Sequence, residues 1–92
     1  MDLKQLESEI ISQISLNLED SKEKVPVITG STGVFKGISG FDSLRAMELL
    51  VTLESVYDQE FLPEKVFVRR PPSATTVSDM AKAMQKIIEE TE

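Results

Sequence analysis

The stretch Gly40-Phe41-Asp42-Ser43-Leu44 joins a loop that contains several glycines to a strongly patterned helix, which we expect over 44–57. A serine at such a junction has two interpretations. It can be a helix cap, whose side chain accepts a hydrogen bond from a free N–H group of the first turn. It can also be an exposed hydroxyl that a modifying enzyme reaches. Because these two roles lead to different functions, Ser43 is the central residue of the sequence.

The expected helix over 44–57 carries apolar residues on two sides. One arc of roughly 120° would face a core, and its members are Ala46, Leu49, Leu50, Leu53, Val56 and Tyr57. Leu44, Met47 and Val51 fall on the opposite side. They are surrounded by Glu48, Glu54, Ser55 and Asp58. Three explanations stay open: isolated apolar residues are common on surfaces, the long loop covers these three, or a partner docks there and the acids steer it.

Apolar residues at helical spacing predict two more long helices and one short one. The first long helix runs over 3–18, with Asp2 and Gln5 as a capping pair. The last begins at a cap, Thr75 or Thr76, forms a capping box with Asp79 and ends near residue 89. A short helix near 64–67 has Pro63 in its first turn and ends before the Arg-Arg-Pro-Pro segment 69–72. The apolar stripes are Leu3, Leu6, Ile10, Ile11, Ile14 and Leu18 on the first helix, and Val77, Met80, Ala81, Met84, Ile87 and Ile88 on the last.

Residues 19–41 form one long loop, because Pro26 and the four glycines of the chain interrupt any helical pattern there. We expect the apolar side chains of this loop to pack inward and pin it, namely Val27, Ile28, Phe35 and Ile38. No stretch alternates as a strand would. The sequence therefore predicts an all-α fold in a single domain over 1–92. It is a small four-helix bundle of three main helices and one short helix, with a long loop between the first and second helices.

Composition excludes several functions. Ten Lys and Arg against sixteen Asp and Glu give a formal charge of −6, which argues against nucleic-acid and anionic-membrane binding and suits basic partners, although acidic surfaces also serve solubility. The chain has no His and no Cys, so it lacks the usual catalytic nucleophile pairs and metal ligands. We therefore expect no catalytic residues, no metal site and no enzymatic activity. Without a membrane span or a signal peptide, we expect a cytoplasmic protein.

The surroundings of Ser43 favour more than a capping role. Neither Asp42 nor Ser43 has Glu or Gln three positions on, so no capping box forms. Gly40 leaves the approach to the serine free of side-chain bulk. A phosphodiester on Ser43 would lie at a helix N-terminus, where the dipole and free amides stabilise negative charge, and Arg45 could pair with it.

The segment from Gly40 to Leu49 resembles the motif of acyl carrier proteins, in which the serine of Asp-Ser-Leu bears 4′-phosphopantetheine. Glu48-Leu49, Leu53-Glu54 and Thr76-Val77 match the family's later positions, and the length, acidity, loop and helix order match as well. The resemblance thus covers nearly the whole chain. It implies a non-catalytic carrier that acts as a covalent shuttle, whose arm a phosphopantetheinyl transferase attaches to Ser43 with Mg²⁺ and coenzyme A.

The resemblance also implies roles for other residues of the chain. Partner enzymes would dock through residues on and beside the second helix, namely Asp42, Leu44, Arg45, Met47, Glu48, Val51 and Glu54. A bound acyl chain would lie beside Leu49, Leu53, Met80 and Met84. The partners would be acyl-loading and acyl-processing enzymes of fatty-acid, polyketide or related lipid biosynthesis (a synthetase, a ketosynthase, an acyltransferase), and the carrier would be a monomer that does not insert into membranes.

Some residues depart from the pattern of fatty-acid carriers. Arg45 stands where an acid is frequent, the segment from Glu64 to Pro72 is net basic, and Phe41 is more typical of polyketide-type carriers. Two alternatives therefore stay open. One is a peptidyl or D-alanyl carrier, which shares the arm and the bundle. The other is an unmodified helical module that binds a protein through Leu44, Met47 and Val51.

Overall fold

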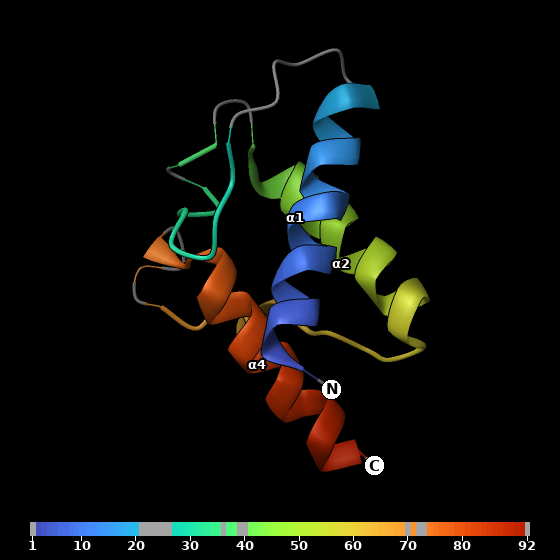
Figure 1. The fold of residues 1–92 in the computed structure, drawn as a ribbon. Coiled ribbons are helices and arrows are strands. Elements are labelled where there is room, and N and C mark those ends of the chain that lie inside the picture. The colour runs from blue at the N-terminus through green and yellow to red at the C-terminus, as the bar shows by residue number, and fades with distance from the viewer. Residues whose placement is uncertain are drawn as a thin grey trace.

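Four helices, in the predicted order, make up the regular secondary structure of the described residues in the computed structural model (Figure 1). The structure describes residues 2–20, 27–35, 37–38, 41–69, 71 and 74–91. The helices are α1 (Leu3–Asp20), α2 (Ser43–Tyr57), α3 (Pro63–Val66) and α4 (Val77–Thr91). The predicted all-α bundle of three main helices and one short helix is confirmed. Pro26, Gly40, Arg70 and Pro72, which the sequence analysis used, lie outside the described residues.

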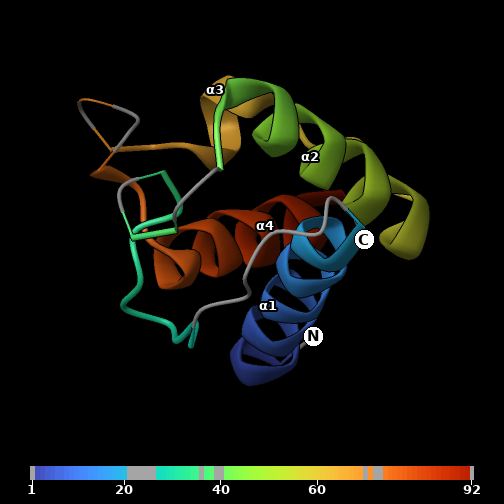
Figure 2. The ribbon, with the colours of Figure 1, turned by 90° about the horizontal axis from the view of Figure 1, so that it is seen from above.

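The helix α1 packs against both other long helices, and α3 packs against α4. Both α2 and α4 run opposite to α1 in Figure 1, and Figure 2 shows the same helices from above. The predicted stripes form the core where the three long helices meet. The buried members are Leu6, Ile10, Ile14 and Leu18 of α1, Ala46, Leu49, Leu50 and Leu53 of α2, and Val77, Met80, Ala81, Met84 and Ile88 of α4.

Two apolar residues predicted to be inside are exposed. Val56 of α2 is 45% exposed, whereas Leu50 at the opposite rim of the predicted arc is buried, so the buried side of α2 is shifted toward Leu50. Val27 of the long loop is 90% exposed. The expectation that Val27 pins the loop is therefore wrong. Backbone hydrogen bonds hold the loop in its place.

The long loop is tied to the start of α4 through its main chain. The N–H of Val77 donates to the carbonyl of Thr32 at 3.0 Å, and the N–H of Ser78 donates to the carbonyl of Gly30 at 2.8 Å. The first N–H groups of a helix have no partner within the helix. The loop carbonyls supply that partner, so they cap α4 and fix the loop in one step.

Apolar packing completes the attachment of the loop. The N–H of Val34 donates to the carbonyl of Thr75 at 2.9 Å, next to the isolated β-bridge that joins the loop to α4. Val34 and Ile38 are buried, while Ile28 and Phe35 are half-buried against the core. Three of the four predicted inward residues thus pack as expected.

The predicted capping box of α4 is present and has an additional partner. The N–H of Thr76 donates to Asp79 Oδ2 at 3.0 Å, and the N–H of Asp79 donates to Thr76 Oγ1 at 3.1 Å. Arg69 adds two hydrogen bonds to the same carboxylate, from Nε at 2.8 Å and from Nη2 at 3.2 Å. The Arg69 bond is the main cause that lowers the pKa of Asp79 from 3.8 to about 2. Partial burial raises this pKa, and the two bonds with Thr76 lower it further.

We predict that acid weakens this junction over a defined range. Because the pKa of Asp79 is lower in the folded chain than its ordinary value of 3.8, the carboxylate stabilises the fold above pH 3.8. That stabilisation is lost as the pH falls to about 2. Asp79→Asn should therefore unfold more easily than the wild type at neutral pH, and the difference should shrink on acidification.

The measurement is urea unfolding of both chains at a series of pH values. Glu89→Gln, which changes an exposed acid near the other end of α4, is the control and should keep the wild-type acid-dependent loss. A gap between Asp79→Asn and wild type that stays constant down to pH 2 would contradict the prediction.

Candidate functional site

The N-terminus of α2 is capped by Asp42 and not by Ser43. Asp42 has an extended backbone (φ −107°, ψ −173°), and its Oδ1 accepts a hydrogen bond from the N–H of Arg45 at 3.0 Å. Its carbonyl accepts the first helical bond, from the N–H of Ala46 at 3.0 Å. This is the standard geometry of an aspartate cap. Ser43 is therefore the first residue inside the helix.

Ser43 is exposed, and its hydroxyl has no hydrogen-bond partner among the described residues. The N–H groups of Ser43 and Leu44 are also unpaired within that part of the chain, as first-turn N–H groups are unless something caps them. Of the two interpretations of Ser43, the structure thus gives the capping role to its neighbour. The serine hydroxyl is left accessible at a helix N-terminus.

An aromatic cluster holds the chain immediately before this site. Phe41 is buried, and its N–H donates to the carbonyl of Ile38 at 3.2 Å. The ring of Phe35 lies 6.3 Å from that of Phe41 and 5.2 Å from that of Phe67, measured between centroids. Such tilted and edge-on pairs are favourable aromatic geometries. Phe41 therefore anchors the start of α2 to the loop and to the segment after α3.

The second apolar side of α2 faces solvent. Leu44 is 68% exposed, Met47 is 43% exposed and Val51 is 64% exposed. We call these three residues the apolar stripe. Their exposure confirms the side predicted from the helical spacing, and the described part of the long loop does not cover them. The stripe begins directly beside Ser43.

The acids expected around the apolar stripe differ in availability. Asp42 and Glu48 are exposed. Glu54 is half-buried, and its Oε2 accepts a hydrogen bond from the N–H of Phe61 at 2.9 Å. Its carbonyl also accepts the N–H groups of Asp58 and Gln59, which close the end of α2. Glu54 thus serves the helix end, and the exposed acids are Asp42, next to Ser43 in the chain, and Glu48, which follows Met47 of the apolar stripe.

Arg45 is directed to α1. Its Nη1 donates to Asn17 Oδ1 at 2.8 Å and to the carbonyl of Asn17 at 3.4 Å. That carbonyl belongs to the last turn of α1, where carbonyls lack helical partners and a cation is favourable. The expectation that Arg45 is free to pair with a phosphate on Ser43 is not supported, because residues two apart on a helix do not face each other.

Asn17 is the residue of this region that the sequence analysis missed. Its Nδ2 donates to Glu48 Oε2 at 3.4 Å, so one side-chain amide contacts both Arg45 and Glu48 of α2. The contact joins residues 28 and 31 positions apart. The sequence offers one weak signal for this contact, which is that Asn17 is a polar residue next to the last member of the apolar stripe of the first helix.

The four residues expected to line an acyl chain come together in the core. Leu49, Leu53, Met80 and Met84 are all buried and belong to one hydrophobic cluster. They pack as ordinary core residues, so an acyl chain between them would require the side chains to move apart. Methionine side chains are the most adaptable of these.

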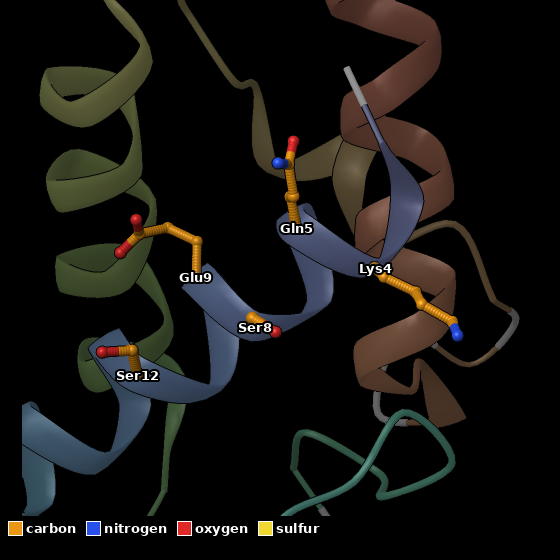
Figure 3. A pocket seen from close by; sticks show the side chains of 5 residues that line it. All are labelled: Lys4, Gln5, Ser8, Glu9 and Ser12. Carbon is orange, nitrogen blue, oxygen red and sulfur yellow. The ribbon is translucent and has the colours of Figure 1, made fainter.

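Two surface hollows lie away from Ser43. One, of about 430 Å³, is lined by five polar side chains from the first half of α1 (Figure 3): Lys4, Gln5, Ser8, Glu9 and Ser12. Another, of about 340 Å³, is lined by residues of α3, α4 and the segment after α3: Lys65, Val68, Ala83, Lys86, Ile87 and Glu90. Neither includes a residue of the predicted site.

Two other kinds of site are absent from the described residues. They contain no group of three or more His, Cys, Asp or Glu side chains that could hold a metal ion. None of the described helices combines the length and the apolar character needed to cross a membrane. In comparisons with known proteins, no family model, no curated protein and no solved structure matches this chain.

We predict that Asp42 and Ser43 differ sharply in their contribution to stability. Asp42→Ala removes the acceptor for the N–H of Arg45 and should lower the free energy of unfolding by about 1 kcal/mol. Ser43→Ala removes a hydroxyl without a partner and should change it by less than about 0.5 kcal/mol. Urea unfolding at neutral pH measures both. A larger loss for Ser43→Ala than for Asp42→Ala would mean that the serine is the cap.

Proposed function

We propose that this chain is an acyl carrier protein, in which Ser43 bears 4′-phosphopantetheine. The observation that carries the proposal is the division of roles at the start of α2, where Asp42 caps the helix and Ser43 keeps an exposed, unbonded hydroxyl. A serine needed as a cap could not be esterified without loss of the cap. Here the ester would leave the cap intact.

The residues at this site suit the proposed group. Ser43 Oγ would lose its proton and bond to the phosphorus next to the pantetheine of coenzyme A, while the pyrophosphate bond breaks and adenosine 3′,5′-bisphosphate leaves. The unpaired N–H groups of Ser43 and Leu44, with the positive end of the α2 dipole, favour a negative charge there. When bound, the group supplies a thiol that carries acyl groups as thioesters. Since the chain has no cysteine of its own, no internal thiol competes for them.

The surface beside Ser43 suits a partner with apolar and basic contacts. The apolar stripe gives such a partner area to bury, and the exposed carboxylates of Asp42 and Glu48 complement basic side chains. The formal charge of −6 adds long-range attraction. We propose that a phosphopantetheinyl transferase and the acyl-loading and acyl-processing enzymes dock here in turn, in the cytoplasm, and that the carrier itself catalyses nothing.

The proposed carrier has variants that differ in the group carried on the arm. Fatty-acid and polyketide carriers transport acyl chains, whereas peptidyl and D-alanyl carriers transport amino-acyl groups on the same arm. An unmodified interaction module is the rival from another class, since it would use the apolar stripe and leave Ser43 unmodified. The first experiment below separates this rival from all carriers.

We predict that Ser43 is the only site of modification. Incubated with coenzyme A, Mg²⁺ and a phosphopantetheinyl transferase of broad specificity, the wild type should gain the mass of one phosphopantetheine in an intact mass spectrum. Ser43→Ala should gain nothing. Ser55→Ala is the matched control, because Ser55 is an exposed serine of the same helix, and it should be modified fully.

No gain of mass by the wild type with several such transferases would reject the carrier and leave the interaction module. An equal gain by wild type and Ser43→Ala would place the modification elsewhere.

We also predict that the transferase binds the apolar stripe. Met47→Ala should raise the KM for this chain at least about fivefold, which corresponds to about 1 kcal/mol of lost binding. Val56→Ala is the control, because Val56 is 45% exposed against 43% for Met47 but lies off the stripe. It should stay within about twofold of wild type. Equal effects of the two substitutions, or loss of helicity in Met47→Ala, would contradict the proposed docking face.

A further inference from the structure

Arg45 and Glu48 lie three positions apart on α2, where opposite charges ordinarily pair. No ion pair between them is present in the part of the chain that the structure describes. Instead the amide of Asn17 lies between the two charges. Its Oδ1 accepts from Arg45 at 2.8 Å, and its Nδ2 donates to Glu48 at 3.4 Å.

The two contacts of Asn17 differ in strength. The 2.8 Å bond to the guanidinium is short, and the carbonyl of Asn17 adds a longer one. The 3.4 Å bond to Glu48 is long and exposed. Arg45 is therefore held firmly at the end of α1 by neutral acceptors, while the Glu48 carboxylate keeps its charge and remains open to solvent.

The position of Arg45 makes this anchoring necessary for the docking face. Arg45 and Ser43 lie on different sides of α2, roughly 160° apart at 3.6 residues per turn. Glu48 lies between the apolar stripe and the side that faces α1. A released Arg45 would therefore meet Glu48 first and would neutralise the exposed acid that borders the apolar stripe.

We propose that Asn17 is a positioning residue that keeps Arg45 away from Glu48, so that basic partners of the carrier bind Glu48 as a free carboxylate. The inference rests on the proposed function for its effect on docking. The partner group that it concerns is a lysine or arginine of a phosphopantetheinyl transferase or of a later enzyme.

The test measures transfer of phosphopantetheine to Ser43 in a double-mutant cycle. Asn17→Ala should raise the KM for the carrier about fivefold with kcat unchanged, because a single docking ion pair is weakened. In the Arg45→Gln background no cation remains to be released. The same Asn17→Ala change should there alter KM by less than about twofold.

Two further variants separate positioning from a merely structural role. Asn17→Asp retains an acceptor for Arg45 and should keep KM within about twofold of wild type. Gln13→Ala removes an amide one turn earlier on α1, which bonds Glu9 of the same helix, and should leave KM unchanged. An equal rise of KM in both Arg45 backgrounds, or no rise in Asn17→Ala, would overturn the inference.

A crystal structure of Asn17→Ala tests the inference without any enzyme. It should show the Arg45 guanidinium within about 4 Å of the Glu48 carboxylate. A guanidinium that stays on α1 would overturn the inference. Failure of the wild type to accept phosphopantetheine would instead reject the proposed function, and the crystal structure would still decide where Arg45 goes.

Discussion

The structure depends most on how the free N–H groups at the start of α4 find acceptors. Two are satisfied by the reciprocal side-chain bonds of Thr76 and Asp79, and two by the carbonyls of Gly30 and Thr32 in the long loop. A buried or half-buried N–H without an acceptor costs more than a single hydrogen bond contributes. The same bonds that complete α4 therefore fix the loop, and its buried apolar side chains add to the attachment.

Aromatic packing connects the fixed loop to the candidate site. Phe35 contacts both Phe41 and Phe67, so the end of the loop is attached to the bundle just before α2 begins. Asp42 then completes the helix start, and Ser43 emerges in a fixed position. For the docking that we propose, such support lowers the cost of binding, because less freedom is lost when the partner binds.

The sequence predicted what periodicity controls and missed what depends on how helices meet. The buried stripes, the capping box and the exposed apolar stripe all follow from spacing along one helix. Val56 was placed inside because an arc on a wheel does not show where packing ends. The contact of Arg45 with Asn17 spans 28 positions and depends on the relative placement of α1 and α2. No local pattern contains that information.

At the start of α2, Ser43 and Glu48 are both left exposed because a neighbouring residue makes a bond that they could have made. Asp42 takes the capping role that Ser43 could have taken, and the serine hydroxyl stays unbonded. Asn17 takes the cation that Glu48 could have paired with, and the carboxylate keeps its charge. In both places a neighbouring polar group makes the bond that the fold needs and leaves a hydroxyl or a carboxylate exposed. An isolated Asp-Ser dipeptide before a helix provides the first of these arrangements only, and the second requires that α1 end beside Arg45.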